Sequence, residues 1–525
     1  MKSPTKIIVS LVLCALIFSM ACNLLNAIRP SDETPPLDIL IESGENQPEE
    51  LVPNDTEPIE GEPEPVVEEE PVQNPPQNET VQPGPYAIFV GQTTVTFFND
   101  IDMAPKVVNL NGYVVSVVPS PFGGKVAIVR SENEDFSGMF WFDLLDLATG
   151  QVSTITPLAN EQTVMNDWET AEIGKPPRGA NFATVLSDPV WRPDGSAVVF
   201  ISAHQGLYAR PYSYMVDSAT INDLSLTGEA HYYAPSISPN GDYIVVPCAK
   251  SFGTGAGLDM DTYWMARVSG GEARIIADVS EASNVLTRGW LDDQTVVFSV
   301  GDIIAGGKNL RAVNIITGNM IEITGPNDYV DNVAVGPYTG TILFTTMMEE
   351  LGDYVDGNTI NKNALYAWNI GMQQYGEIND RVTWGSFIEW NPDTNCYYVD
   401  QFNGGQEADF VQPYTGAGTI NEMTCRPLTA NVKNIPDFSA TLEYFAWTIG
   451  TYEVSAPTGL YVQGFTDNRE IRLADIALPF AWHPFNDVLI FAQETRIYQA
   501  VPPEFTLDQV LEAPESISKV FWVNP

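Results

Sequence analysis

The chain has 525 residues and a formal net charge of −44 at pH 7, with 44% hydrophobic residues, 40 glycines and 39 prolines. This length allows two or three average domains, or one large repeat domain behind a tail, and the many turn-forming residues argue against long helices. A surface this acidic repels phosphate groups, so we expect no nucleic-acid partner and no binding of anionic lipid head groups, whereas cationic ligands and basic partners remain open.

The N-terminus has the pattern of a secretory signal. Lys2 and Lys6 precede an apolar run over residues 7–18, which is too short to span a membrane comfortably, and Ser19-Met20-Ala21 lead into Cys22. This ending resembles the bacterial lipobox, although serine stands where leucine is preferred. The resemblance implies that residues 1–21 are a lipoprotein signal peptide and that acylated Cys22 anchors the chain stably to a lipid bilayer. A plain secretory signal is the alternative.

Residues 22–85 have the composition of a tether. Between residues 30 and 80 there is no Lys or Arg, while Glu and Pro recur throughout, as in the run EGEPEPVVEEEP. Such a segment cannot bury a core, and like charges together with proline keep it extended. We therefore expect a disordered acidic linker that holds the following region away from the membrane or cell-wall surface.

The clearest folded element is the stretch over residues 187–202, SDPVWRPDGSAVVFIS. Two runs of strand-forming residues flank Pro193-Asp194-Gly195, a turn in which proline pre-sets φ, aspartate bonds nearby backbone and glycine accepts positive φ. The pattern predicts a β-hairpin.

Looser copies of this hairpin recur along the chain at a spacing typical of four-stranded repeats. We find them at residues 113–130, 233–248, 284–299, 329–346, 384–400, 434–449 and 476–494. A second pair of strands follows several of them, at residues 140–156, 262–277, 309–324 and 459–473. Each unit is therefore predicted to be a four-stranded antiparallel sheet, and such sheets bury both faces only by packing against one another.

The run VWRPDG at residues 190–195 resembles the WD-like β-propeller repeat family with a Trp-Ser-Pro-Asp-Gly core, which includes the C-terminal propeller of TolB. The resemblance covers residues 86–525 and implies a single all-β propeller in which this turn joins the two inner strands of each blade. Residues 86–110 and 517–525 match the parts of one further blade, closed by strands from both termini. Because the literal count of nine exceeds the usual range, we expect one irregular copy and eight blades, with seven and nine as alternatives.

Motifs for catalysis are absent from the sequence. His204, His231 and His483 lie far apart, and there is no zinc motif, no G-x-S-x-G elbow and no sialidase aspartate box. A glycosidase with two dispersed carboxylates would leave no local signature. An enzyme is therefore the less favoured interpretation.

We expect no cofactor, with calcium the one ion that the composition leaves open. Carboxylates cluster at residues 99–102, 258–261 and 353–358, all expected in loops, but none matches an EF-hand, which favours plain solvated turns. The cysteines suggest a disulfide. Cys396 and Cys425 fall in neighbouring strand pairs of one unit and are predicted to form it in an oxidising compartment, with Cys248 a buried thiol.

Seven tryptophans are spread among the predicted blades: Trp264, Trp290, Trp368, Trp384, Trp390, Trp447 and Trp482. Most are expected to pack between blades, and exposed ones could stack on sugars or peptides. We therefore predict an extracytoplasmic, lipid-anchored binding or scaffold module for an envelope protein or glycan. The alternative is a secreted glycan-active or other hydrolase with carboxylates at the channel. Any site should lie where the copies differ: in the insertion at residues 160–179, in loops between hairpins, or at the channel mouth.

Overall fold

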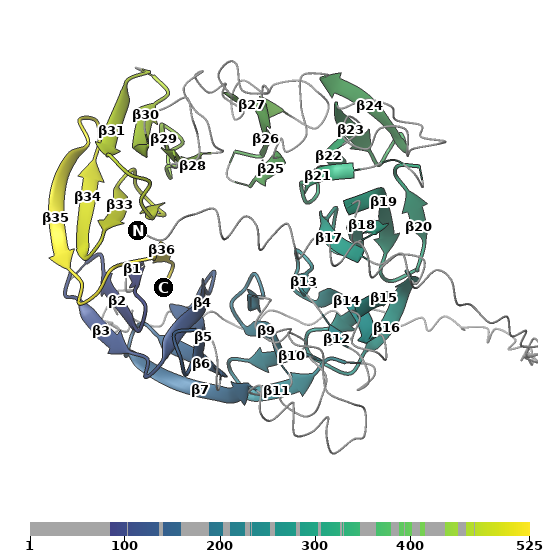
Figure 1. Ribbon diagram of the computed structural model, residues 1–525, viewed down its shortest axis with the longest axis horizontal. Helices are drawn as coiled ribbons and strands as arrows, with labels where there is room; N and C mark the ends of the chain where they lie inside the picture. Colours follow the sequence, from purple (N-terminus) through teal and green to yellow (C-terminus); the bar gives the residue numbers. More distant parts are fainter. Residues whose placement is uncertain are drawn as a thin grey trace, which may run out of the picture. The chain divides into compact units, whose positions relative to one another are not determined.

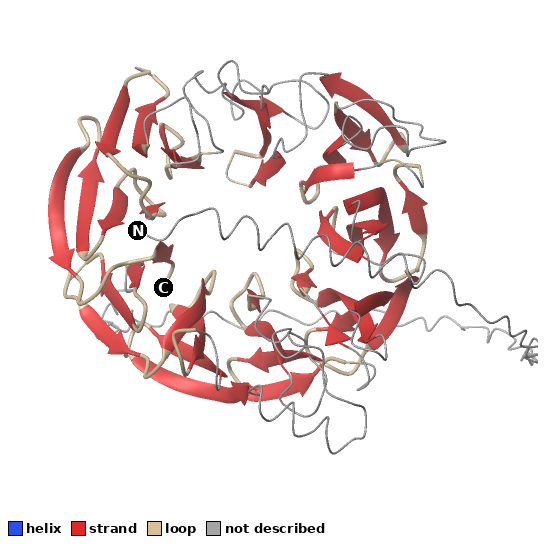
Figure 2. Cartoon of the chain, viewed as in Figure 1, coloured by secondary structure: helices blue, strands red, loops and turns tan. Residues whose placement is uncertain are grey.

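The computed structural model describes residues 84–101, 103–135, 140–158, 188–202, 210–225, 231–232, 234–251, 258–279, 284–302, 306–325, 328, 330–346, 364–379, 388–392, 394–401, 410–414, 436–449, 458–466 and 468–525. The chain divides into two compact units, Met1–Asn78 and Glu79–Pro525, and every described residue belongs to the second. All regular elements in these ranges are β-strands (Figure 2). None of the described residues forms a helix with the length and hydropathy of a membrane span. The predicted signal peptide and almost all of the tether lie outside these ranges.

The strands form antiparallel sheets that follow chain order. The first four sheets are β36-β1-β2-β3 (Lys519–Val523, Tyr86–Val90, Thr94–Asn99, Lys106–Asn109), β4 to β7 (Tyr113–Pro119, Lys125–Ser131, Phe140–Asp146, Gln151–Leu158), β8 to β11 (Val190–Trp191, Ala197–Ser202, Arg210–Met215, Thr220–Asp223), and β12 to β16 (His231–Tyr232, Ser236–Ile237, Tyr243–Ser251, Leu258–Arg267, Ala273–Asp278).

The remaining sheets continue this arrangement. They are an eight-stranded sheet of β17 to β24 (Asn284–Trp290, Thr295–Asp302, Gly306–Asn314, Met320–Glu322, Val330–Val335, Thr341–Thr346, Leu365–Asn369, Gln374–Asn379), then β25 to β27 (Ile388–Asn391, Cys396–Gln401, Phe410–Tyr414), β28 to β31 (Asp437–Phe438, Tyr444–Ile449, Gly459–Gly464, Glu470–Ala474), and β32 to β35 (Phe480–Trp482, Leu489–Gln493, Arg496–Val501, Thr506–Glu512). Among the described residues, the two halves of the eight-stranded sheet are joined by a single residue pair, Gly307 with Val330. The architecture is β-propeller-like.

All eight predicted inner hairpins form, as the pairs β4–β5, β8–β9, β13–β14, β17–β18, β21–β22, β25–β26, β28–β29 and β32–β33. The four predicted outer pairs form as β6–β7, β15–β16, β19–β20 and β30–β31. Burial follows the position of a strand in its sheet. Strands such as β9 are buried along their whole length, whereas outer strands such as β3 and β35 are largely exposed. In Figure 1 the outer strands β7, β11, β16 and β35 lie at the edge of this unit.

The core lies between neighbouring sheets. The side chains of Trp191 and Phe200 pack with Phe142 of the preceding sheet, whose ring centroid lies 4.4 Å from that of Phe200. Ile201 and Val199, which point to the other face of the same sheet, pack with Val246 and Trp264 of the next. Because strand residues alternate between faces, one run of apolar residues fills two interfaces, which explains why the inner strands read as nearly continuous hydrophobic segments.

The Pro-Asp-Gly turn forms as its residues predict. The Ser196 amide and hydroxyl both donate to Asp194 Oδ1, at 3.0 and 2.7 Å, and Gly195 has φ +71°. The next turn repeats the geometry, with the Asp242 amide donating to Asn240 Oδ1 at 3.0 Å and Gly241 at φ +75°.

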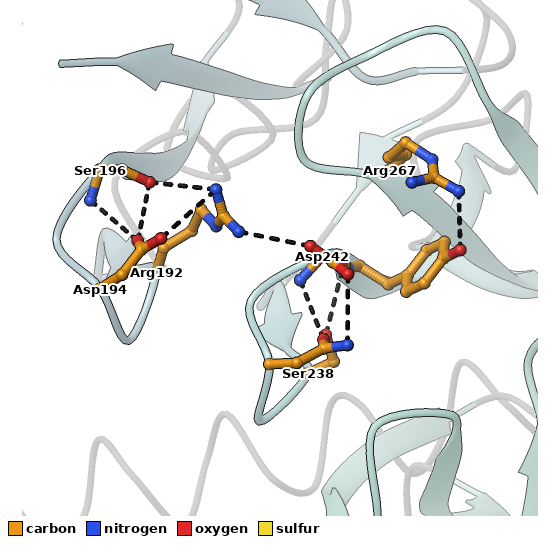
Figure 3. A network of polar contacts seen from close by, with 8 residues as sticks. Arg192, Asp194, Ser196, Ser238, Asp242 and Arg267 are labelled. Atoms are coloured by element: carbon orange, nitrogen blue, oxygen red, sulfur yellow. Dashed lines mark hydrogen bonds and ion pairs between the residues drawn. The ribbon is translucent and has the colours of Figure 1, made fainter. Parts of the chain in front are cut away.

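Successive turns also contact one another. The guanidinium of Arg192 pairs with the Asp242 carboxylate of the next turn at 3.3 Å (Figure 3). Further along, the Tyr338 hydroxyl donates to Asp293 Oδ1 at 2.6 Å and the Thr441 hydroxyl donates to Asp487 Oδ2 at 2.7 Å. At these three places an inner turn therefore stabilises its neighbour as well as its own hairpin.

Strands from both ends of the unit share one sheet, because β36 pairs antiparallel with β1. Glu515, just before β36, accepts hydrogen bonds from the amides and hydroxyls of Thr93 and Thr94 at 2.6 to 3.2 Å. Although partial burial acts to raise it, these hydrogen bonds hold the pKa of the Glu515 carboxyl below its usual value. The carboxylate is therefore ionised at neutral pH and ties the C-terminal segment to the β1–β2 turn.

Candidate binding groove

A groove of about 470 Å³ lies along the first strands and turns of four consecutive hairpins, β13, β17, β21 and β25. Its lining residues are Pro193, Ile237, Ser238, Pro239, Arg288, Gly289, Trp290, Val333, Ala334, Val335, Pro337, Ile388, Glu389 and Trp390. These strands lie on the inner side of the unit in Figure 1. The sequence predicts a site where the repeat copies differ, and the groove is lined by residues of several successive copies. The insertion at residues 160–179 lies outside the described residues.

A β-bulge shapes one wall of the groove. The register of β17 against β18 shifts between Thr287 and Gly289, which leaves Arg288 as the extra residue. Gly289 has φ +147°, and a Cβ atom there would lie 2.9 Å from Cβ of Val335 on β21. Only glycine fits so close an approach in this conformation, so the sequence Arg-Gly-Trp brings β17 and β21 together and turns Arg288 out of the regular ladder.

Arg288 is held in place on two sides. Its Nε donates to Ser299 Oγ at 2.9 Å, and one Nη donates to the backbone oxygen of Asp331 at 3.3 Å. Burial lowers the pKa of the guanidinium, and the nearby Asp331 carboxylate opposes that shift. The group remains charged because arginine begins so far above neutrality. The groove wall therefore carries a fixed positive charge.

The β25 strand contributes an acid and an indole to the groove. Partial burial of the carboxyl raises the pKa of Glu389, although the residue as a whole is exposed on β25. The Trp390 ring packs on Tyr397 with centroids 4.7 Å apart. The Tyr397 hydroxyl in turn donates to the Thr341 carbonyl at 2.7 Å and accepts from the Gly336 amide at 2.9 Å. This arrangement presents a half-buried aromatic side chain on a rigid support.

Most of the predicted tryptophans lie in the core, as expected. Trp264, Trp290, Trp368 and Trp447 are at most 5% exposed. Two tryptophans also connect neighbouring hairpins, because their indole nitrogens donate to the first strand of the preceding hairpin. Trp191 donates to the Val118 carbonyl of β4 at 2.9 Å, and Trp290 donates to Ser236 Oγ of β13 at 3.0 Å. Trp384 lies outside the described residues.

The other predicted site residues give a mixed outcome. Cys22 and Cys425 lie outside the described residues, so lipidation and the Cys396–Cys425 pairing stay predictions. Cys396 is disulfide-bonded and fully buried in β26, and Cys248 is a thiol buried in β14.

The candidate calcium loops are only partly described. Residues 353–358 and Asp102 lie outside the described residues. Residues 258–261 are not a loop but the start of β15, whose backbone pairs with β14 there. Among the described residues, no three His, Cys, Asp or Glu side chains cluster in a way that could hold a metal ion.

A smaller cavity of about 140 Å³ lies beside His483. The Nδ1 atom of His483 accepts from the Phe485 amide at 3.1 Å, so Nε2 carries the proton and donates to Asp100 Oδ2 at 3.1 Å. A histidine oriented by a carboxylate is one part of a catalytic triad, but none of the residues lining this cavity is a serine or cysteine. The contact joins the turn after β32 to the end of β2, which is a structural role.

Comparisons with known proteins give a likeness of structure only. No protein-family model matches the sequence, and no curated protein matches it significantly. Similar solved structures include dipeptidyl peptidase 4 of Porphyromonas gingivalis (10% identity, 76% of this chain and 60% of that chain, TM-score 0.47), TolB of Acinetobacter baumannii (15%, 56% and 62%, 0.27) and apo AztD of Citrobacter koseri (10%, 84% and 98%, 0.41). The chain thus spans about three fifths of the length of the first two. With TM-scores below 0.5, the fold assignment depends on the sheets of this chain itself.

Proposed function

We propose that the protein is an extracytoplasmic, lipid-anchored binding module that takes a protein or glycan partner in the groove between β13, β17, β21 and β25. The groove supports this function most directly. It is concave, mainly apolar, and carries two aromatic side chains with three side chains of polar type, Ser238, Arg288 and Glu389, which is the usual character of a ligand site. Among its described lining residues Glu389 is the only carboxylate, which favours binding over carboxylate-pair catalysis.

We also propose that the fold is a propeller of nine blades, the higher of the two alternatives to eight. The two halves of the eight-stranded sheet, joined by one residue pair, act as separate blades, which turns eight sheets into nine. Nine hydrophobic clusters support this count, because each is shared by two successive blades. The ninth packs Phe89 of β1 against Ile490 of β33 and so links the last blade to the first. The β1–β36 pairing then closes the circle.

The lipid anchor is tested by Cys22→Ala. We expect the wild-type chain to incorporate labelled palmitate and sediment with membranes, because several acyl chains give stable attachment. The variant should be unlabelled, uncut before residue 22, and no longer anchored through its acylated N-terminus. Palmitate incorporation by the variant would show that Cys22 is not the acylated residue, and release of the unlabelled wild-type chain as a soluble protein would show a plain secretory signal instead.

The groove is tested by Trp390→Ala in the full chain, with Trp482→Ala as the matched control. Trp482 occupies the corresponding strand position in β32, outside the groove, where its indole donates to the Asp437 carbonyl at 3.0 Å. We expect Trp390→Ala to weaken retention of the partner from native envelope extracts at least about ten-fold, because central aromatic residues carry much of the binding energy. Trp482→Ala should retain it. Equal retention by both variants, with both folded, would remove the groove from the proposal.

The second candidate function is hydrolysis of a glycan. The observation that favours it is the raised pKa of Glu389, as a general acid requires. In that case purified protein should cleave acidic or neutral oligosaccharides, and Glu389→Gln should lower the rate about 100-fold or more. Under the binding function Glu389→Gln keeps partner retention and no turnover is detected.

A further inference from the structure

Arg288 is a positive charge without an ionic partner in a strongly acidic protein. Its hydrogen bonds go to the Ser299 hydroxyl and the Asp331 backbone carbonyl, and no described residue forms an ion pair with it. The net charge of the chain is −44, and other arginines of this region, such as Arg192 and Arg267, are paired with carboxylates. The Asp331 carboxylate is close enough to raise the pKa of the guanidinium but forms no ion pair with it, so the group keeps hydrogen-bond donors for an external anion.

The backbone conformation places Arg288 in the lining of the groove. Arg288 is the extra residue of the bulge in β17, and bulges of this kind redirect a side chain from the sheet towards a site. The contacts with Ser299 and Asp331 use Nε and one Nη, which leaves the donors of the other Nη for a ligand. The guanidinium is therefore oriented before a ligand arrives, which lowers the entropic cost of binding.

The other lining residues indicate which chemical groups are attached to the bound anion. Around Arg288 the walls are formed by prolines, valines, Ile237, Ala334 and the two indoles, with few hydrogen-bonding side chains. A sugar would leave most of its hydroxyls without partners on such walls, at a cost for each. An apolar side chain, in contrast, would be buried favourably. The groove thus suits a carboxylate attached to apolar groups better than an acidic glycan.

We propose that Arg288 binds the terminal carboxylate of a protein partner whose last residues are apolar. This inference rests on the proposed binding function and narrows its partner to a protein with such a C-terminus. Guanidinium and carboxylate form paired, charge-assisted hydrogen bonds, and the apolar residues lie along the walls formed by β21 and β25. Glu389, on β25, repels an anion and so favours the orientation with the carboxylate at β17.

The test uses acetyl-Ala-Pro-Leu-Leu with a free carboxylate and the same peptide with a C-terminal amide, titrated into the full chain by calorimetry. We expect the acid to bind about ten-fold or more tightly than the amide, since a hydrogen bond to a charged group is stronger than one to a neutral group. Arg288→Gln should bind both peptides equally weakly. Arg496→Gln, which removes an exposed arginine on β34, should keep the preference, and Glu389→Gln should bind the acid at least as tightly as the wild-type chain.

Two further measurements separate the possible failures. Equal binding of acid and amide, or binding of sodium glucuronate but not of the peptide acid, would contradict the peptide carboxylate. In the envelope retention assay, loss of the partner by Trp390→Ala but not by Arg288→Gln would support binding in the groove and contradict the role of Arg288 in binding a carboxylate. Retention by both variants would instead contradict the proposed groove. Circular dichroism of each variant establishes that it is folded.

Discussion

Replacing Asp143 with asparagine should lower the free energy of unfolding by about 3 to 5 kcal/mol, the usual cost of removing one partner of a buried ion pair. Asp143 on β6 is fully buried and accepts a hydrogen bond from Nε of Arg130 on the neighbouring β5. The arginine also lies over the Trp141 ring, 4.2 Å from its centroid, and is itself 9% exposed. Without the carboxylate its charge stays buried and uncompensated.

The matched control lies on the same strand. Asp146 of β6 pairs with Lys125 of β5 at 2.7 Å, but both side chains are a quarter to a third exposed. Asp146→Asn should cost at most about 1 kcal/mol, as for other solvent-accessible pairs. Denaturation midpoints in urea measure both losses. The double replacement Arg130→Met with Asp143→Leu should recover much of the stability lost in Asp143→Asn. Equal losses for Asp143→Asn and Asp146→Asn would show that the burial of an ion pair does not determine the cost of removing its carboxylate.

Gly195→Ala should lower the free energy of unfolding by about 2 to 4 kcal/mol. Two causes act together. The residue has φ +71°, which an alanine adopts only with strain, and its new Cβ atom would lie 2.6 Å from the Phe122 carbonyl oxygen and 2.8 Å from Ser120 Oγ in the preceding turn. Because one of these neighbours is backbone, two blades would have to separate slightly.

Gly318→Ala separates the two causes. Gly318 has φ +73°, nearly the same conformation, and an added Cβ atom would meet no atom within 4 Å. Gly318→Ala should therefore lower the free energy of unfolding only by the cost of the backbone conformation, about 1 kcal/mol. Thermal unfolding of the three proteins gives the comparison. If Gly195→Ala and Gly318→Ala melt together, the contact between successive turns contributes nothing to stability.

The turns and strand pairs could be predicted because their causes are local. The residues Pro193-Asp194-Gly195 set their own turn, and alternating apolar runs set the hairpins. The copy at residues 434–449 shows how far this extends. It has no turn glycine, yet Leu442 takes φ +59° and its amide donates to the Ser439 carbonyl at 2.9 Å, as Gly241 does to Ser238 at 2.8 Å. Here the packing of neighbouring blades imposes a conformation that leucine alone disfavours.

The groove could not be predicted because its causes are not local. Ile237, Arg288, Val335 and Trp390 belong to four repeats, and only blade packing brings them to one surface. A bulge changes the face to which each following residue points, and the sequence between Thr287 and Trp290 does not fix its position. One signal was available: Arg-Gly-Trp places a glycine directly before the last residue of the first inner strand, where none of the other hairpin copies has a glycine.

The sharing of one sheet by β1 and β36 sets the order of events during synthesis. Thr93 and Glu515, whose contact fastens this sheet, are 422 positions apart in the chain. During synthesis β1 therefore waits, with one edge and an apolar face uncovered, until residues 519–523 have been made. Intermediate blades can form meanwhile, since each contains its own strands. A nascent chain that stops before residue 519 leaves the edge of β1 open for pairing with another molecule. The five residues of β36 therefore protect the protein from association through β1.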